Sequence, residues 1–266
     1  MMNLCLLVRW PFVGSAVLTL GLATPAWATP LLGAAQGFSV LGGSAVTNTG
    51  ATTLVGDLGV YPGASITGGS TVTLTGTVHQ GDAVAQQAQS DTATAVGMLN
   101  SQTATANLTG QDLGGMNLTP GVYDFDASAQ LTGTLVLNYQ NNANAVFVFR
   151  ILQALTTASS AVVSIINGSA NEGLFWQVGS SATLGSGTLF AGSLLADQSI
   201  TLGTGAQILC GRAIALNAAV TMDTNTVSTV CPPDAPDASG GSVPEPAPLG
   251  LVALALGVLT WVRRRA

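Results

Sequence analysis

The sequence contains very little charge and no lysine. Only 7% of the 266 residues are charged, and the six basic residues are all arginines. Three of these arginines stand together at the C-terminus, so the rest of the chain has no cluster of basic side chains. Nucleic-acid binding needs such a cluster to contact phosphates, and the composition therefore excludes a nucleic-acid partner.

Groups that could carry out catalysis are equally scarce. The single histidine, His79, lies between a strand-like run and a helix-like run, where turn polarity explains it. Asp124 and Asp126 would share one strand face, as acidic pairs do in β-helical polysaccharide lyases, but the sequence shows no basic partner for them. We expect a solvated strand end there. No phosphate-binding loop or metal-ligand spacing is present, so we predict no enzyme activity, no cofactor and no metal site.

The N-terminus reads as a secretion signal. Residues 1–28 contain Arg9, an apolar run over 12–22 and the A-x-A-type cleavage site Ala26-Trp27-Ala28. We predict a signal peptide over 1–28; a retained anchor is the alternative, although the run is short for a membrane span.

The C-terminal residues 243–266 read "VPEPAPLGLVALALGVLTWVRRRA" with the preceding residues forming a Pro/Gly-rich linker over 232–242. The order of Pro-Glu-Pro, short apolar helix and basic tail resembles the PEP-CTERM sorting signal of Gram-negative bacteria. That resemblance implies an exosortase-type processing enzyme as a partner, a transient membrane contact through the apolar helix only, and release to the cell surface or into exopolysaccharide. A plain C-terminal anchor is the alternative.

Cysteine is rare as well. Cys5 leaves with the signal peptide, so the mature chain keeps Cys210 and Cys231. An isolated pair in an oxidising exterior predicts a disulfide between them.

What the sequence does have is a repeated phrase. Ser181-Ala-Thr-Leu-Gly recurs 18 residues later as Ser199-Ile-Thr-Leu-Gly, with similar copies around Thr156, Thr221 and Thr47. An interval of about 18 to 20 residues suits three short strands per closed coil, so 29–231 is predicted as a β-solenoid domain. A sandwich would also have short strands but would not need a fixed interval. Apolar runs at 162–166, 174–178, 188–191 and 208–214 fit the other two sides, with turns at Gly185, Gly187, Gly203 and Gly205.

Strand alternation then separates an inner set from an outer set. Leu155, Thr157, Ala182, Leu184, Ile200, Leu202, Val220 and Met222 are predicted to face inward. The outward set is small or carries a hydroxyl and has no charge: Ala154, Thr156, Ser181, Thr183, Ser199, Thr201, Ala219 and Thr221, with Ala45 and Thr47 if the N-terminal copy joins the stack. The absence of charge favours a binding surface on which hydroxyl and methyl groups hold ordered water in a regular array. The alternative is that exposed strand positions favour threonine in any sheet.

One segment breaks the strand pattern. Residues 81–102 are rich in Ala and Gln and place Val84, Ala88, Ala95, Val96 and Leu99 near one face. They predict a helix that lies along the solenoid.

The body as a whole resembles the secreted microbial ice-binding-protein-like family. The matching phrases are "FSVLGGSAVTNTGATTLVGDLGVYPG" (38–63), "GGMNLTPGVYDFDASAQLTGTLVLN" (114–138), "FWQVGSSATLGSGTLFAGSLLA" (175–196) and "GRAIALNAAVTMDTNTV" (211–227). The resemblance implies a mainly β fold: a discontinuous, right-handed, three-sided β-solenoid with one long helix alongside, whose N-terminal segment stacks on the C-terminal coils. It also implies a secreted or surface-displayed protein with an ice crystal surface as its partner. A non-catalytic structural or adhesive component of the surface matrix is the alternative.

Overall fold

The structure is a computed structural model that describes residues 31–142, 144–168 and 173–231. The predicted signal peptide, the 232–242 linker and the 243–266 sorting signal lie outside the described residues, as do residues 143 and 169–172. Within the described ranges, no helix has the length and apolar character needed to cross a membrane. The described part from Leu32 onward belongs to one compact unit.

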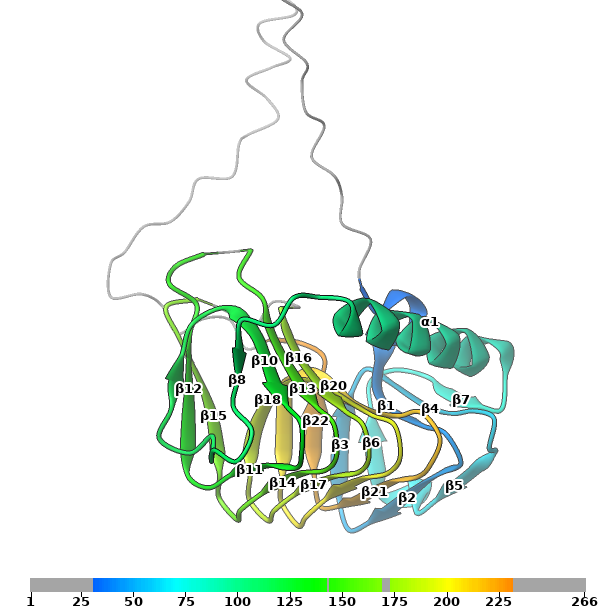
Figure 1. Ribbon diagram of the computed structural model, residues 1–266. Helices are drawn as coiled ribbons and strands as arrows, with labels where there is room; N and C mark the ends of the chain where they lie inside the picture. The colour runs from blue at the N-terminus through cyan, green and yellow to red at the C-terminus, as the bar shows by residue number, and fades with distance from the viewer. Residues whose placement is uncertain (1–30, 143, 169–172, 232–266) are drawn as a thin grey trace, which may run out of the picture. The chain divides into compact units, whose positions relative to one another are not determined.

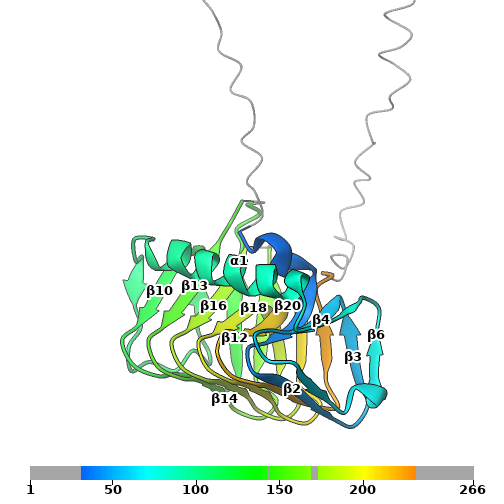
Figure 2. The ribbon, with the colours of Figure 1, turned by 90° about the vertical axis from the view of Figure 1, so that its right-hand side faces the viewer.

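The strands of this unit stack in parallel on three sides (Figures 1 and 2). The first, which we call the threonine side, is a separate seven-stranded sheet. Its order is β11 (Ala129–Leu131), β14 (Leu155–Thr157), β17 (Ala182–Leu184), β19 (Ile200–Leu202), β21 (Val220–Asp223), β2 (Ala45–Thr49) and β5 (Ser65–Thr67).

The other two sides form one fifteen-stranded sheet, because two long strands run across the corner between them. What we call the second side contains β9 (Asn117–Leu118), β12 (Thr134–Asn138), β15 (Val162–Ile166), the first halves of β18 (Leu189–Ala196) and β20 (Gln207–Ala215), β22 (Thr226–Ser228), β3 (Thr52–Val55) and β6 (Val72–Leu74). What we call the helix side contains β8 (Ala106–Asn107), β10 (Gly121–Phe125), β13 (Phe147–Ile151), β16 (Leu174–Val178), the second halves of β18 and β20, β1 (Phe38–Gly42), β4 (Asp57–Val60) and β7 (Val78–Gln80).

The stack is discontinuous in sequence, as the resemblance implied. On each side a strand from the N-terminal segment pairs with a strand from the C-terminal coils: β2 with β21, β3 with β22 and β1 with β20. In Figure 1 the blue and cyan strands accordingly continue the row that the yellow and orange strands begin. The coils built from 38–80 therefore form one end of the stack, although in the sequence the helix lies between them and the coils that follow.

The predicted apolar runs coincide with strands, with one difference at the corners. β15 and β16 have the predicted bounds, whereas β18 and β20 continue around the corner with a register shift between Ala191 and Ser193. Of the turn glycines, Gly187 and Gly205 have positive φ angles of 68° and 73°. Gly185 has no positive φ; a Cβ there would meet the carbonyl carbon of Ala158 at 2.7 Å. Such glycines are required by the close approach of successive coils rather than by φ.

Aromatic residues pack against one another in the interior of the stack. The rings of Tyr123, Phe149, Trp176 and Phe190 form a continuous series, with centroid separations of 5.5, 4.0 and 4.9 Å. The Trp176 indole N–H donates to the Ala191 carbonyl at 3.0 Å, so the largest buried side chain leaves no polar atom unpaired. These ring contacts between successive coils hold the coils in register with one another.

The helix α1 (Ala83–Asn100) lies along the helix side, at the top of Figures 1 and 2, with the short helix η1 (Gly33–Gly37) against it. A second short helix, η2 (Gly69–Thr71), precedes β6. Asp82 caps the N-terminus of α1, and its carboxylate accepts a hydrogen bond from the Ala85 amide at 2.9 Å. The predicted helix is confirmed, but its predicted face is partly wrong, because Val84 is 46% exposed. The buried stripe is Ala85, Ala88, Gln89, Thr92, Ala95 and Leu99.

The predicted disulfide is present. Cys210 in β20 is bonded to Cys231, which follows β22, and their Cα atoms are 4.1 Å apart. The bridge therefore ties the last described residue to the coil beside it.

Candidate functional site

On six of its seven strands, the threonine side carries a threonine that is aligned with the threonines of the neighbouring strands. Thr156 pairs with Thr183, Thr183 with Thr201 and Thr201 with Thr221; Thr221 pairs with Thr47, and Thr47 with Thr67. We call these six residues the threonine row. All are exposed except Thr47, which is half-buried. Because parallel strands are about 4.8 Å apart, the row is about 24 Å long.

A second row of small residues lies two positions before each threonine. We call it the small row: Ala154, Ser181, Ser199, Ala219, Ala45 and Ser65. The Ser199 hydroxyl donates to the Ser181 hydroxyl at 2.9 Å, which links adjacent coils along the row. The placement predicted for the first five pairs of the two rows is confirmed, including Ala45 and Thr47.

The residues beneath these rows are inward and tightly packed, as predicted. Leu155, Ala182, Leu184, Ile200, Leu202, Val220 and Met222 are at most 1% exposed. Thr157, the one hydroxyl predicted to face inward, is 3% exposed; its oxygen lies 2.8 Å from the Thr188 hydroxyl and accepts from the Gly185 amide at 2.9 Å. A buried hydroxyl with both partners costs little, so this coil keeps the same geometry as its neighbours.

The acidic residues near this side lie at its margins. Asp223 ends β21 at the corner, where it accepts from the Thr204 hydroxyl at 2.5 Å. Asp112 forms an isolated parallel β-bridge with Gln130 at the end of the stack. Burial raises the pKa of Asp112, but hydrogen bonds from the Thr132 hydroxyl and the Gly114 and Thr132 amides outweigh burial and lower this pKa below its ordinary value. The rows themselves carry no charge.

Two positions of the threonine side were not predicted. Thr67 extends the row by one coil, and Gln130 occupies the corresponding position in β11 at the other end. Thr67 could have been predicted from the sequence. The tripeptide Ser65-Ile66-Thr67 is identical to residues 199–201, and Thr67 follows Thr47 by the 20 residues that one coil requires. Gln130 follows the same alternation but has an amide in place of the hydroxyl, so a search for threonine does not find it.

The other two sides differ from the threonine side. On the second side the equivalent outward row mixes sizes and chemistries, with Leu189 42% exposed between Val162 and Gln207. The helix side is partly covered by α1, whose Gln89 donates to the Ala215 carbonyl of β20 at 3.0 Å. In Figures 1 and 2 the strands of the threonine side lie along the lower edge, away from α1. Among the three sides formed by the described residues, only the threonine side combines uniform small side chains with an open surface.

The residues considered for catalysis have structural partners. The expectation of an unpartnered, solvated pair at Asp124 and Asp126 is wrong for Asp124, which receives two hydrogen bonds from Arg150 of the next coil at 2.6 and 2.7 Å. Asp126 is exposed and accepts from Asn107 at 2.8 Å. His79 Nδ1 lies 2.8 Å from Asp82. The Ala85 amide and then His79 lower the pKa of Asp82. No group of three or more His, Cys, Asp or Glu residues that could hold a metal occurs among the described residues.

Comparison with known proteins agrees with this architecture. The family model described as ice-binding-like matches residues 40–228. An ice-binding protein of Nostoc sp. (strain HG1) is 52% identical over 201 residues, which cover 76% of this chain and 74% of the relative.

Solved structures agree as well. An ice-binding protein from an Antarctic biological consortium is 41% identical with a TM-score of 0.72, over 75% of this chain and 91% of the other. One from the Antarctic ascomycete Antarctomyces psychrotrophicus is 38% identical with a TM-score of 0.71, over 76% and 98%. The family and these relatives are described as ice-binding, which agrees with the prediction that this chain is not an enzyme. The chain belongs to the ice-binding-like family.

Proposed function

We propose that this protein binds ice through its threonine side and thereby inhibits the growth or recrystallisation of ice. The observation that carries the proposal is the register of the threonine row, which brings six threonines from six coils into one straight, uncharged row. Relatives that share this fold and up to 52% of aligned residues are named ice-binding proteins.

The mechanism follows from the spacing of the rows. Neighbouring threonines are about 4.8 Å apart across strands, and the threonine and small rows are about 6.6 Å apart along strands. These distances approximate repeats between oxygen atoms on an ice surface. Water held by the hydroxyls and enclosed by the methyl groups can therefore join the ice lattice.

Rigidity makes this arrangement effective. Five of the six threonines are attached to strands whose inward residues are buried, and only in β5 is the inward residue, Ile66, half-buried, so little backbone entropy remains to be lost when the surface meets ice. Binding is the sum of many weak interactions, and flatness matters more than any single hydrogen bond.

We further propose that the protein acts outside the cell and that its coils are right-handed, the hand that parallel crossover connections favour. The secretion signal over 1–28 would direct export, and an exosortase-type enzyme would remove 243–266 at the sorting signal. The mature protein would then be released or would remain at the surface, with exopolysaccharide as its surroundings. Intact mass of the extracellular form tests this: we expect a start near Thr29 and loss of Arg263 to Arg265.

The functional test is thermal hysteresis and recrystallisation inhibition by the purified extracellular form. We expect a measurable difference between the melting and freezing temperatures of ice, and persistence of small ice grains, at micromolar protein concentrations. Absence of both effects would favour the second candidate, a structural or adhesive role in the surface matrix, to which the predicted sorting signal would deliver the chain equally well.

A further inference from the structure

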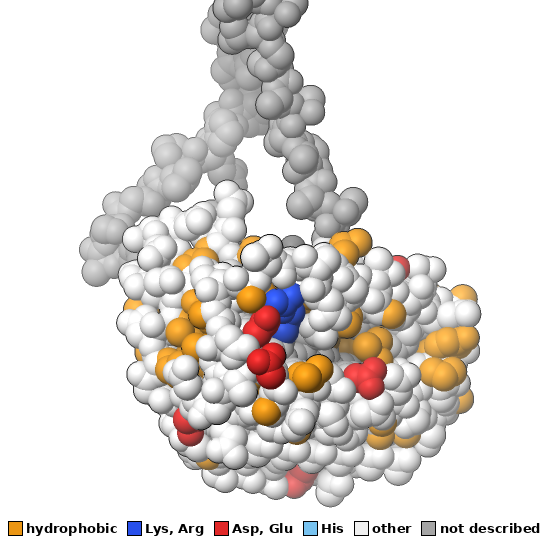
Figure 3. Space-filling model, viewed as in Figure 1, with side chains coloured by type: hydrophobic (Ala, Val, Ile, Leu, Met, Phe, Trp, Pro, Cys, Tyr) orange, Lys and Arg blue, Asp and Glu red, His pale blue; other side chains and the backbone are white. Residues whose placement is uncertain are grey.

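A hollow lies on the helix side, where α1 ends and no longer covers the strands. It consists of two adjoining cavities of about 170 and 260 Å³, both lined by Asn100, Gln177 and Gly179. The first extends over β10 and β13, and the second continues under the helix toward β18. Figure 3 shows acidic and basic side chains gathered beside this hollow on an otherwise sparsely charged surface. We call the two cavities together the trough.

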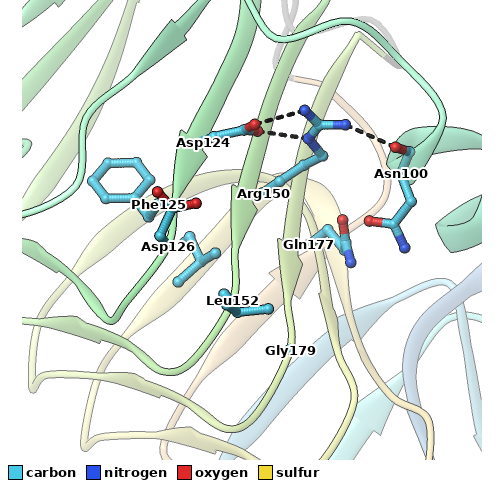
Figure 4. Close-up of a pocket in the computed structure, with 9 residues that line it drawn as sticks. Asn100, Asp124, Phe125, Asp126, Arg150, Leu152, Gln177 and Gly179 are labelled. Carbon is cyan, nitrogen blue, oxygen red and sulfur yellow. Dashed lines mark hydrogen bonds and ion pairs between the residues drawn. The ribbon is translucent and has the colours of Figure 1, made fainter.

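The strongest charges in the trough are already neutralised. Arg150 is held by both carboxylate oxygens of Asp124, and its third nitrogen donates to the carbonyls of Asn100 and Gln102 at 2.9 and 2.8 Å (Figure 4). The guanidinium thus neutralises one acid and also satisfies the carbonyl of Asn100, the last residue of α1, and that of Gln102 just after the helix. No cationic group remains for an anionic ligand among the residues that line the trough, and Asp126 would repel one.

Besides the carboxylates of Asp126 and Asp197, the polar side chains of the trough that remain are amides. The Gln177 Oε1 atom is buried and has no hydrogen-bond partner among the described residues. The carboxamides of Gln177 and Asn100 face the same space (Figure 4). Each amide offers both donors and an acceptor, which is the pattern that a hydroxyl group, itself donor and acceptor, satisfies.

An apolar surface completes the site. Leu152, at the end of the trough, is 66% exposed, and Gly179 beside it leaves the backbone uncovered. In the second cavity Val96, Leu195 and Leu216 form an apolar wall. A ligand that fits both parts has hydroxyl groups on its edge and C–H groups on its face.

We propose that the trough binds a segment of neutral polysaccharide, with at least two sugar units in consecutive cavities. A sugar ring has the required hydroxyl edge and C–H face, and the two cavities together reach the range of about 300–1,000 Å³ that small-molecule sites occupy. This site lies on the helix side and does not depend on ice binding by the threonine side. It would let the protein hold surface polysaccharide and ice at the same time.

The site predicts weak, length-dependent affinity. Because the trough opens to the solvent, water competes with sugar hydroxyls for the exposed Asn100 amide, and binding of one sugar unit in the millimolar range is expected. A second unit uses the second cavity, so a disaccharide binds at least tenfold more tightly than a monosaccharide.

The test is a titration of the purified ¹⁵N-labelled extracellular protein with glucose and with cellobiose, followed by NMR. We expect saturable shifts of the Asn100 and Gln177 side-chain amide signals, with cellobiose the tighter ligand. Gln177→Leu should weaken cellobiose binding at least tenfold. Gln207→Leu, the same change on the second side, should leave it unchanged, and both variants should keep full ice activity.

Several outcomes would overturn the proposal. Shifts that do not saturate with either sugar, shifts confined to other residues, or equal affinity of Gln177→Leu and the wild type each exclude a sugar site in the trough. Loss of ice activity in Gln177→Leu would show that the two sides are not independent. An inactive wild type that still binds cellobiose would refute ice binding alone and leave the trough in place.

Discussion

Replacement of Thr201 by tyrosine is the perturbation with the largest expected effect on the threonine row. Thr201 lies in β19, between Thr183 and Thr221, and its side chain is exposed. A tyrosine ring would project above the surrounding methyl groups and displace the ordered water. Its neighbours are about 4.8 Å away on each side, so at least three of the six coils would lose their fit to a flat ice surface.

The magnitude follows from the number of threonines that the ring would hold away from the ice. If each threonine contributes about 0.5–1 kcal/mol, as a typical hydrogen bond does, three coils account for about 1.5–3 kcal/mol. That corresponds to roughly a 10- to 100-fold weaker adsorption to ice. Stability should change by no more than about 0.5 kcal/mol, because tyrosine is favourable on exposed strand surfaces.

The assay is thermal hysteresis at several protein concentrations, with circular dichroism as the control for folding. Thr53→Tyr is the matched control, because Thr53 is exposed in β3 of the second side and pairs with Thr226 and Thr73. We expect Thr201→Tyr to lose most of the activity and Thr53→Tyr to keep it. Full activity of Thr201→Tyr, or an equal loss in Thr53→Tyr, would refute the assignment of the threonine side.

Other predictions concern the ends of the row and the stability of the fold. Thr67→Tyr should reduce thermal hysteresis less than Thr201→Tyr, since an end residue has one neighbouring threonine instead of two; an equal or larger loss would contradict this. Replacing Cys210 and Cys231 by serine should lower the free energy of unfolding by about 3 kcal/mol for a 21-residue loop, measured by denaturant titration; an unchanged midpoint would argue against the bridge. Arg150→Leu should cost about 2 kcal/mol because it leaves the Asp124 carboxylate and the helix carbonyls without their donor, while ice activity per folded molecule stays constant. The lowered pKa of Asp112 means that its stabilisation is present above the ordinary carboxyl pKa and is lost as pH falls through the folded value; thermal denaturation at pH 7 and pH 3 should show a smaller difference in Asp112→Asn than in the wild type.

The repeated phrase made most of this fold predictable. Within each copy, buried and exposed residues alternate, and the copies recur at a nearly constant interval. Stacking each copy on the next therefore places Thr183, Thr201 and Thr221 in one row. Thr47 followed from the resemblance to a family with a discontinuous stack. The bounds of 162–166 and 174–178 were predictable because turn residues interrupt both apolar runs.

What could not be predicted depends on the packing of one coil against the next. Arg150 and Asp124 are 26 residues apart and meet only because β10 and β13 pair in a register that no local pattern reveals. Val84 looked suitable for the buried helix face, but the packing of α1 against β20 and η1 rotates that residue outward. The close approach at Gly185 likewise depends on the distance between coils rather than on the conformation of one turn.

The most direct test of the central claim is the partition of the protein into slowly grown ice. A hemisphere of ice is grown from a dilute solution of the extracellular protein, and the protein concentrations in ice and in the remaining liquid are compared. The account predicts that the wild type and Thr53→Tyr are enriched in the ice, while Thr201→Tyr is left in the liquid. Exclusion of the wild type from the ice would contradict the claim that the threonine side binds ice.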